Sequence, residues 1–203
     1  LILFGTGKYL ETADTTNTDT QTMYGIWDYN TSGTLPADSL VQQITSMTTG
    51  SNHRTTTQNL VNYSATVKGW YMDLPISGER LTAIPEIQDG LFRFTTIVPS
   101  ASPCDFGGRG FLNIVNFSTG GMLTRPTFDT NGNRVLSLDD GYSSGIEIGF
   151  AMGGVTSIRN SSIGATSDFA VYSRADGTAN NPPVSPGAQG KRGRITWREF
   201  SQE

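Results

Sequence analysis

Short apolar and aromatic runs, separated by long polar segments, dominate the pattern of this 203-residue chain. The runs are rich in β-branched and aromatic residues and are too short for typical helices, as is usual for β-strands. The pattern therefore predicts strands at residues 1–4, 23–29, 67–74, 91–98, 111–117, 146–150, 169–173 and 194–200.

One segment, residues 38–47, has a different pattern. Its apolar residues Leu40, Val41, Ile44 and Met47 are spaced at i, i+1, i+4 and i+7. This spacing fits one face of a short helix, and the same segment also fits a connecting strand. Both alternatives remain open from the sequence.

Alternation along a strand also predicts where individual side chains point. Trp70 and Met72 are two residues apart in segment 67–74, so they share one face, which we expect to pack in the core. Glu79 and Arg80 are adjacent and point in opposite directions in an extended chain. We therefore expect each of them to pair with other residues.

Long polar segments at residues 12–22, 48–65, 119–145 and 175–193 read as surface loops. The last contains three prolines and a Lys-Arg pair and is predicted to be a flexible loop. The whole chain, residues 1–203, is interpreted as part of one domain.

The number of strands predicts an all-β, antiparallel architecture, either a sandwich or consecutive blades of a β-propeller. About two to three blades would result, and the remainder of the propeller would lie upstream, because a propeller needs about four blades to close. The chain begins inside an apolar run, without an initiator Met or a signal peptide. We therefore expect it to be the C-terminal piece of a longer protein.

Composition narrows the class of protein. Charged residues make up only 16% of the chain while Gly reaches 24 residues, a low-charge and turn-rich composition found in many extracellular β proteins. No apolar stretch is long enough for a membrane helix. The net charge of −4 argues against nucleic acid as a partner, since nucleic-acid binders carry clustered positive charge.

One loop has a spacing that is compatible with calcium. Asp129, Asn131 and Asn133 provide oxygen side chains at positions 1, 3 and 5, Val135 provides a carbonyl at position 7, and Asp140 a carboxylate at position 12. Position 6 is Arg134, where an EF-hand has Gly, and no helices are predicted on either side. An ordinary metal-free Asn-Gly turn is the alternative.

Catalytic motifs are not found. The single cysteine, Cys104, is interpreted as a free thiol or as the partner of an upstream cysteine, and the single histidine, His53, has no recognisable catalytic partner. Residues 4–8 lack the spacing of a phosphate-binding loop, and the serines lack a nucleophile elbow. We therefore expect a protein that is not an enzyme.

The order of several short motifs resembles that of a known family. Read in series, they are similar to the C-terminal β-propeller domain of the PilY/PilC-type adhesins of the type IV pilus tip, and the match spans nearly the whole chain. The motifs are FGTGKYL at 4–10, QTMYGIWD at 21–28, KGWYMDLP at 68–75, GER at 78–80, FTTIVPS at 94–100, PC at 103–104 with GG at 107–108, and GRITWRE at 193–199.

The resemblance implies a secreted bacterial protein that is exported through the periplasm and outer membrane to the pilus tip. There it would initiate pilus assembly with minor pilins, oppose retraction and contribute to adhesion to host or abiotic surfaces. The main calcium loop of the family lies before residue 4 and is outside this chain. The loop at Asp129 resembles a second family pattern, from which Asn133 and Arg134 depart.

One hypothesis on partner binding and two alternative functions are also considered. The terminal strand 194–200, or a sheet edge near it, would pair with a minor pilin by strand addition. The alternative function is an extracellular carbohydrate-binding β module, and a hydrolase or quinoprotein built on a propeller is a third possibility without supporting residues. In the carbohydrate alternative the sugar would stack on one of the aromatic side chains Trp27, Trp70, Tyr71 and Tyr142.

Overall fold

A computed structural model describes residues 1–28, 33–100, 108–151, 153–158 and 167–186. These residues form an all-β fold, in which the only helices of the described part are three short 3-10 turns. The elements are β1 (Ile2–Gly5), η1 (Thr12–Thr15), β2 (Thr22–Ile26), η2 (Ala37–Ser39), β3 (Leu40–Met47), β4 (His53–Thr56), β5 (Gly69–Asp73), β6 (Glu86–Gln88), β7 (Leu91–Pro99), β8 (Gly108–Asn116), η3 (Leu138–Asp140), β9 (Gly145–Glu147), β10 (Thr156–Ile158), β11 (Asp168–Ser173), β12 (Ala179–Asn180) and β13 (Pro183–Val184).

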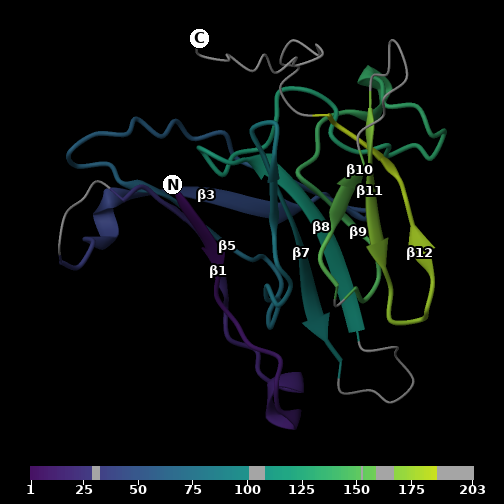
Figure 1. The fold of residues 1–203 in the computed structure, drawn as a ribbon, viewed down its shortest axis with the longest axis horizontal. Coiled ribbons are helices and arrows are strands. Elements are labelled where there is room, and N and C mark those ends of the chain that lie inside the picture. The colour runs from purple at the N-terminus through teal and green to yellow at the C-terminus, as the bar shows by residue number, and fades with distance from the viewer. Residues whose placement is uncertain (29–32, 101–107, 152, 159–166, 187–203) are drawn as a thin grey trace, which may run out of the picture.

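The strands form two sheets. The larger has nine strands in the order β1-β2-β5-β3-β4-β9-β8-β7-β6, and the smaller contains β10, β11, β12 and β13. The larger sheet is strongly curled, so that β3 runs across the view of Figure 1 while β7 and β8 run down it. The expected all-β architecture is confirmed.

One strand pair corrects the expectation of a purely antiparallel fold. β3 pairs with β5 in parallel, with Leu40 opposite Gly69 and Ile44 opposite Asp73, so the larger sheet is mixed. A parallel pair needs a crossover connection. Here the chain leaves β3, forms β4 and returns through residues 57–68 before β5 begins.

Seven of the predicted strands correspond to β1, β2, β5, β7, β8, β9 and β11, although β9 is shorter than predicted. The open segment 38–47 is resolved as a 3-10 turn followed by β3. Two predicted loops contain strands: β4 lies in 48–65, and β12 and β13 lie in 175–193. Predicted strand 194–200 and Cys104 lie outside the described residues.

Two hydrophobic clusters form the core, one on each face of the β7–β8 hairpin. Phe92, Phe94 and Val115 pack with Trp70 on one side, whereas Leu112 belongs to the cluster of β9 and β11 on the other. Because both faces of the hairpin are covered, burial runs through most of both strands without alternating, and it includes polar residues as well as apolar ones.

The predicted faces of β5 are confirmed. Trp70 is fully buried and Met72 has 2% of its surface exposed, whereas Tyr71 and Asp73 on the opposite face are only partly buried. On that outer face the Tyr71 ring stacks on Tyr24 of β2, which in turn stacks on Phe4 of β1. The inner face of β5 therefore packs in the hydrophobic core, and its outer face contributes to a row of stacked aromatic rings.

Candidate functional site

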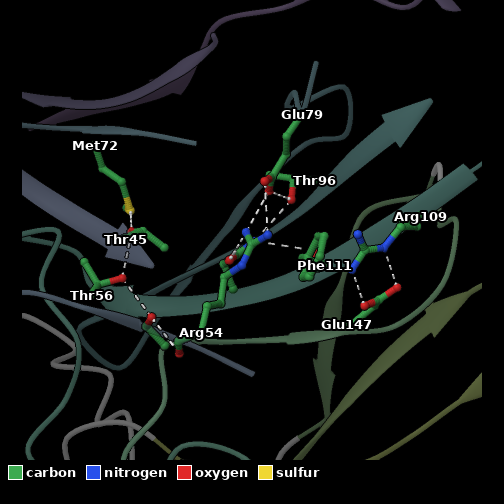
Figure 2. A network of polar contacts seen from close by, with 11 residues as sticks. Thr45, Arg54, Thr56, Met72, Glu79, Thr96, Arg109, Phe111 and Glu147 are labelled. Carbon is green, nitrogen blue, oxygen red and sulfur yellow. Dashed lines mark hydrogen bonds and ion pairs between the residues drawn. The ribbon is translucent and has the colours of Figure 1, made fainter. Parts of the chain in front are cut away.

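A buried ion pair lies at the centre of the curled sheet (Figure 2). Arg54 of β4 donates from Nη1 and Nη2 to the two oxygens of Glu79, at 2.7 and 3.0 Å, and neither side chain is exposed. Thr96 donates a hydrogen bond to the same carboxylate, and Arg54 also donates to Asn113 Oδ1 at 3.2 Å. The guanidinium lies 3.6 Å from the ring centroid of Phe111.

The network extends to both sides of this pair. Arg109, 5.4 Å from the Phe111 ring centroid, makes a two-pronged contact with Glu147 at 2.8 and 2.7 Å, and these hydrogen bonds hold the pKa of Glu147 below its usual range. On the other side, the hydroxyls of Thr45, Thr56 and Ser144 form a chain in which neighbours lie 2.8 and 2.7 Å apart. The central charges have no exposed surface, and the network cross-links the strands.

The predicted opposite orientation of Glu79 and Arg80 is confirmed, because the two side chains bind different partners. The Arg80 guanidinium donates to the carbonyls of Gly78, Lys8 and Asn17, at 2.9, 2.9 and 2.7 Å. Lys8 and Asn17 stand near the two ends of the long connection between β1 and β2. One buried cation therefore ties this connection to the body of the protein.

The predicted calcium loop is brought together by the structure. Asp129 accepts hydrogen bonds from the backbone N–H groups of Gly132 and Arg134, at 2.8 and 2.6 Å. Asn131 accepts from Asn133 at 3.0 Å, and Asn133 accepts from Val135 at 2.7 Å. Arg134, at the position where an EF-hand has Gly, adopts a left-handed φ of 64°.

Asp140 closes the same loop from the far end. It is 6% exposed, and its carboxylate accepts from the backbone N–H groups of Thr130, Asn131 and Ser137, at 2.9, 3.3 and 2.8 Å. The side chains of this loop offer only oxygen atoms as metal ligands, the type of ligand that calcium prefers. These local hydrogen bonds also account for the loop without an ion. No group of three or more His, Cys, Asp or Glu side chains is placed to hold a metal in the described part of the chain.

Replacing Asp140 with Ala is expected to lower the free energy of unfolding by about 1–3 kcal/mol, because three partly buried hydrogen bonds to backbone N–H groups would lose their acceptor. Urea denaturation measures this loss. The matched control is Asp139→Ala, the exposed neighbour, which should change stability by less than about 0.5 kcal/mol. Equal stability of the two variants would contradict a role for Asp140 in closing the loop.

Calcium binding at this loop stays a prediction, and a thermal melt tests it. A bound ion would raise the melting temperature in calcium relative to EDTA, because a ligand that binds only the folded state stabilises it. Asp129→Ala should remove that rise. A melting temperature that does not depend on calcium would leave the loop as a metal-free turn.

The four candidate sugar-stacking aromatics differ in access. Trp70 is fully buried, and its Nε1 donates to the Phe117 carbonyl at 3.1 Å. The prediction that a sugar could stack on Trp70 is therefore wrong. Tyr71 stacks on Tyr24, while Tyr142 is 51% exposed. Trp27 is partly exposed, contacts Tyr63 edge-on and lines two adjoining hollows.

The larger of these hollows lies where β2, β5 and β3 have neighbouring ends. Trp27 and Asp28 follow β2, Lys68 precedes β5, and Asp38 lies just before β3. Of the residues that line this hollow, only Trp27 was predicted from the sequence to belong to a site. The only local signal was an aromatic residue followed by an acidic residue at the end of a strand.

His53 lies half-buried on β4, and burial lowers its pKa. No helix among the described residues has the length and apolar character needed to cross a membrane.

Comparison with known proteins places these features in a family. A family model described as the PilY1 beta-propeller domain matches residues 1–65. A type IV pilus biogenesis factor PilY1 homolog of Xylella fastidiosa is 30% identical over 98% of the chain. The crystal structure of the Pseudomonas aeruginosa PilY1 C-terminal domain matches with a TM-score of 0.69 and 26% identity, covering 91% of this chain and 41% of that one. The chain belongs to the PilY1 family.

Its fold is therefore part of the C-terminal β-propeller domain of the PilY1 family, as the motif order predicts. The Pseudomonas aeruginosa PAO1 type IV pilus biogenesis factor PilY1 is 31% identical over 70% of the chain. The chain spans only 14 to 16% of the length of these two PilY1 relatives.

Proposed function

We propose that this chain is part of a type IV pilus biogenesis factor that acts at the pilus tip. In this role it works with minor pilins in assembly, opposes retraction and contributes to adhesion to host or abiotic surfaces. The protein is non-catalytic and reaches the cell surface by export through the periplasm and outer membrane. The observation that carries the proposal is the resemblance to PilY1-family pilus biogenesis factors over 98% of the chain.

The buried polar network supports a mechanical or adhesive role. The most strongly polar part of the core, around Arg54 and Glu79, is closed to solvent and links β4 to β7 and β8. Such a network stabilises a rigid scaffold and leaves recognition to exposed strand ends and loops.

Counting surface pili tests the proposal. Deleting the gene that encodes the parent protein is expected to abolish piliation, and pili should partly return when the retraction motor is also removed. That pattern follows because an assembly factor that opposes retraction is dispensable only when retraction is absent. Normal piliation in both backgrounds would contradict the proposal.

The strand-addition hypothesis concerns residues 194–203, which lie outside the described residues. Deleting this segment is expected to abolish co-purification of minor pilins while the circular dichroism spectrum of the fold remains. Co-purification that survives the deletion would contradict it.

A further inference from the structure

The hollow beside Trp27 has a floor fixed by main-chain hydrogen bonds. The Trp27 N–H donates to the Lys68 carbonyl at 2.7 Å, and the Lys68 N–H donates to the Ser39 carbonyl at 2.7 Å. These bonds continue the pairing of β2, β5 and β3 beyond the last residues of the strands. The floor is therefore part of the sheet and not of a loop.

Local hydrogen bonds also hold the two walls. Ser39 donates from its hydroxyl and from its N–H to the Pro36 carbonyl, at 2.6 and 3.0 Å. On the other side, the Ser64 hydroxyl accepts from the N–H groups of Thr66 and Val67, at 3.2 and 3.1 Å. A hollow with a floor and walls of this kind is formed before any ligand arrives, which lowers the cost of binding.

The lining combines one aromatic ring with a few polar groups. Trp27 provides the ring, Ile2 and Ile26 an apolar edge, and Asp28 and Asp38 two exposed carboxylates. The Lys68 ammonium lies 5.7 Å from the Trp27 ring centroid. The hollow encloses about 640 Å³, within the range of roughly 300–1,000 Å³ that is usual for small-molecule sites.

We propose that this hollow, which we call the Trp27 groove, binds a neutral saccharide. The apolar face of a sugar ring would stack on the indole, which offers a large flat surface at little entropic cost. The hydroxyl groups would donate to the carboxylates of Asp28 and Asp38, because ionised carboxylates are strong acceptors. A neutral sugar is favoured over an acidic one, since the hollow is lined by two acidic residues and one lysine, and the chain carries a net charge of −4.

The inference rests on the proposed role in surface adhesion and names the class of surface ligand. It also selects one residue among the four candidate aromatics. Trp70 is enclosed by the core and Tyr71 is stacked on Tyr24, whereas Trp27 adjoins both a mixed polar hollow and a smaller apolar one with Tyr63 and Phe117.

The first test is a glycan array that carries neutral and acidic oligosaccharides, probed with the 203-residue chain. Neutral glycans that bind are then titrated by isothermal calorimetry. Trp27→Ala and Asp28→Asn should each weaken binding by at least about tenfold, while Trp27→Phe, which keeps a ring, should lose less. The matched control Tyr142→Ala removes another exposed aromatic outside the groove and should leave affinity unchanged.

Each result is decisive when the melting temperatures of the variants match that of the original chain. Glycan binding that survives both Trp27→Ala and Asp28→Asn would overturn the location. Binding of acidic glycans alone, or of none, would overturn the ligand class.

The same substitutions in the parent protein separate this inference from the proposed function. Cells carrying Trp27→Ala should assemble normal numbers of pili and lose attachment to a surface coated with the neutral glycan. Loss of pili on deletion of the gene, together with unchanged attachment of the variant, would keep the assembly role and overturn the saccharide site. Normal piliation after gene deletion, together with loss of glycan binding in the Trp27→Ala variant, would overturn the assembly role and keep the saccharide site.

Discussion

Replacing Glu79 with Gln is expected to lower the free energy of unfolding by about 3–5 kcal/mol, the usual cost of breaking a buried ion pair by removing one partner. The carboxylate of Glu79 receives two bonds from Arg54 and one from Thr96, and all three side chains are buried. A neutral amide in its place keeps one oxygen acceptor but removes the negative charge that compensates the desolvated Arg54 guanidinium, and its NH2 group cannot accept the second Arg54 hydrogen bond. Urea denaturation followed by circular dichroism measures the loss.

The Arg109–Glu147 pair provides the matched control. It has the same two-pronged geometry, but its side chains are 52% and 27% exposed. Glu147→Gln should therefore cost less than about 1 kcal/mol, because water screens an exposed pair and solvates the partner that remains. If Glu79→Gln cost no more than Glu147→Gln, the buried pair would contribute nothing beyond its counterpart at the surface.

A double variant separates pairing from burial. Arg54→Met combined with Glu79→Leu removes both charges together and should cost less than Glu79→Gln alone, because no isolated charge is left in the core. A double variant that is less stable than the single one would point to the hydrogen bonds to Thr96 and Asn113 as the larger contribution.

This network also explains why β4 could not be predicted. Residues His53–Thr56 contain no apolar side chain, so hydrophobic alternation assigns them to a loop. The strand nevertheless alternates in burial, with Arg54 and Thr56 inside. Arg54 and Thr56 form hydrogen bonds with residues that are distant in sequence, Glu79 and Ser144 respectively. A strand of this kind is visible only once the tertiary partners are known.

Segment 38–47 was ambiguous for a related reason. In β3 the buried positions are Gln43 and Thr45, while Ile44 is 56% exposed, the reverse of the usual pattern. Gln43 is accommodated because its amide donates to the carbonyls of Asn59 and Thr119, at 2.8 and 2.9 Å. By contrast, β7 and β8 were predicted well, since each strand carries apolar residues on both faces beside buried polar ones such as Thr96 and Asn113.

The candidate sites differ in the same way. The loop from Asp129 to Asp140 is continuous in sequence, so its spacing could be recognised before its geometry was known. The Trp27 groove is assembled from the ends of three strands that are brought together by the crossover between β3 and β5. No local spacing encodes that juxtaposition.

Gly120→Ala is expected to destabilise the protein by about 2–5 kcal/mol, because this residue forms one side of a slot for Trp70. A Cβ at Gly120 would lie 2.3 Å from Trp70 Cε3, and a Cβ at Gly25, near the other end of the indole, would lie 2.3 Å from Cε2 and Nε1. Trp70 is fully buried between them and cannot move without displacing Phe92, which contacts it edge-on. Overpacking of this kind typically costs 1–3 kcal/mol, and a left-handed backbone adds about 1–2 kcal/mol.

Gly132→Ala separates these two contributions. Gly132 has a φ of 76°, close to the 68° of Gly120, but nothing lies within 4 Å of a Cβ built on it. Its substitution should therefore cost only the backbone contribution of about 1–2 kcal/mol. The difference between the two variants, measured by denaturant unfolding, is the contribution of the Trp70 slot. If the two losses were equal, the indole would be moving aside, and the core around β5 would be loosely packed. A difference of about 2 kcal/mol or more, within the range typical of overpacking, would mean that two glycines fix the position of the central tryptophan in the larger sheet.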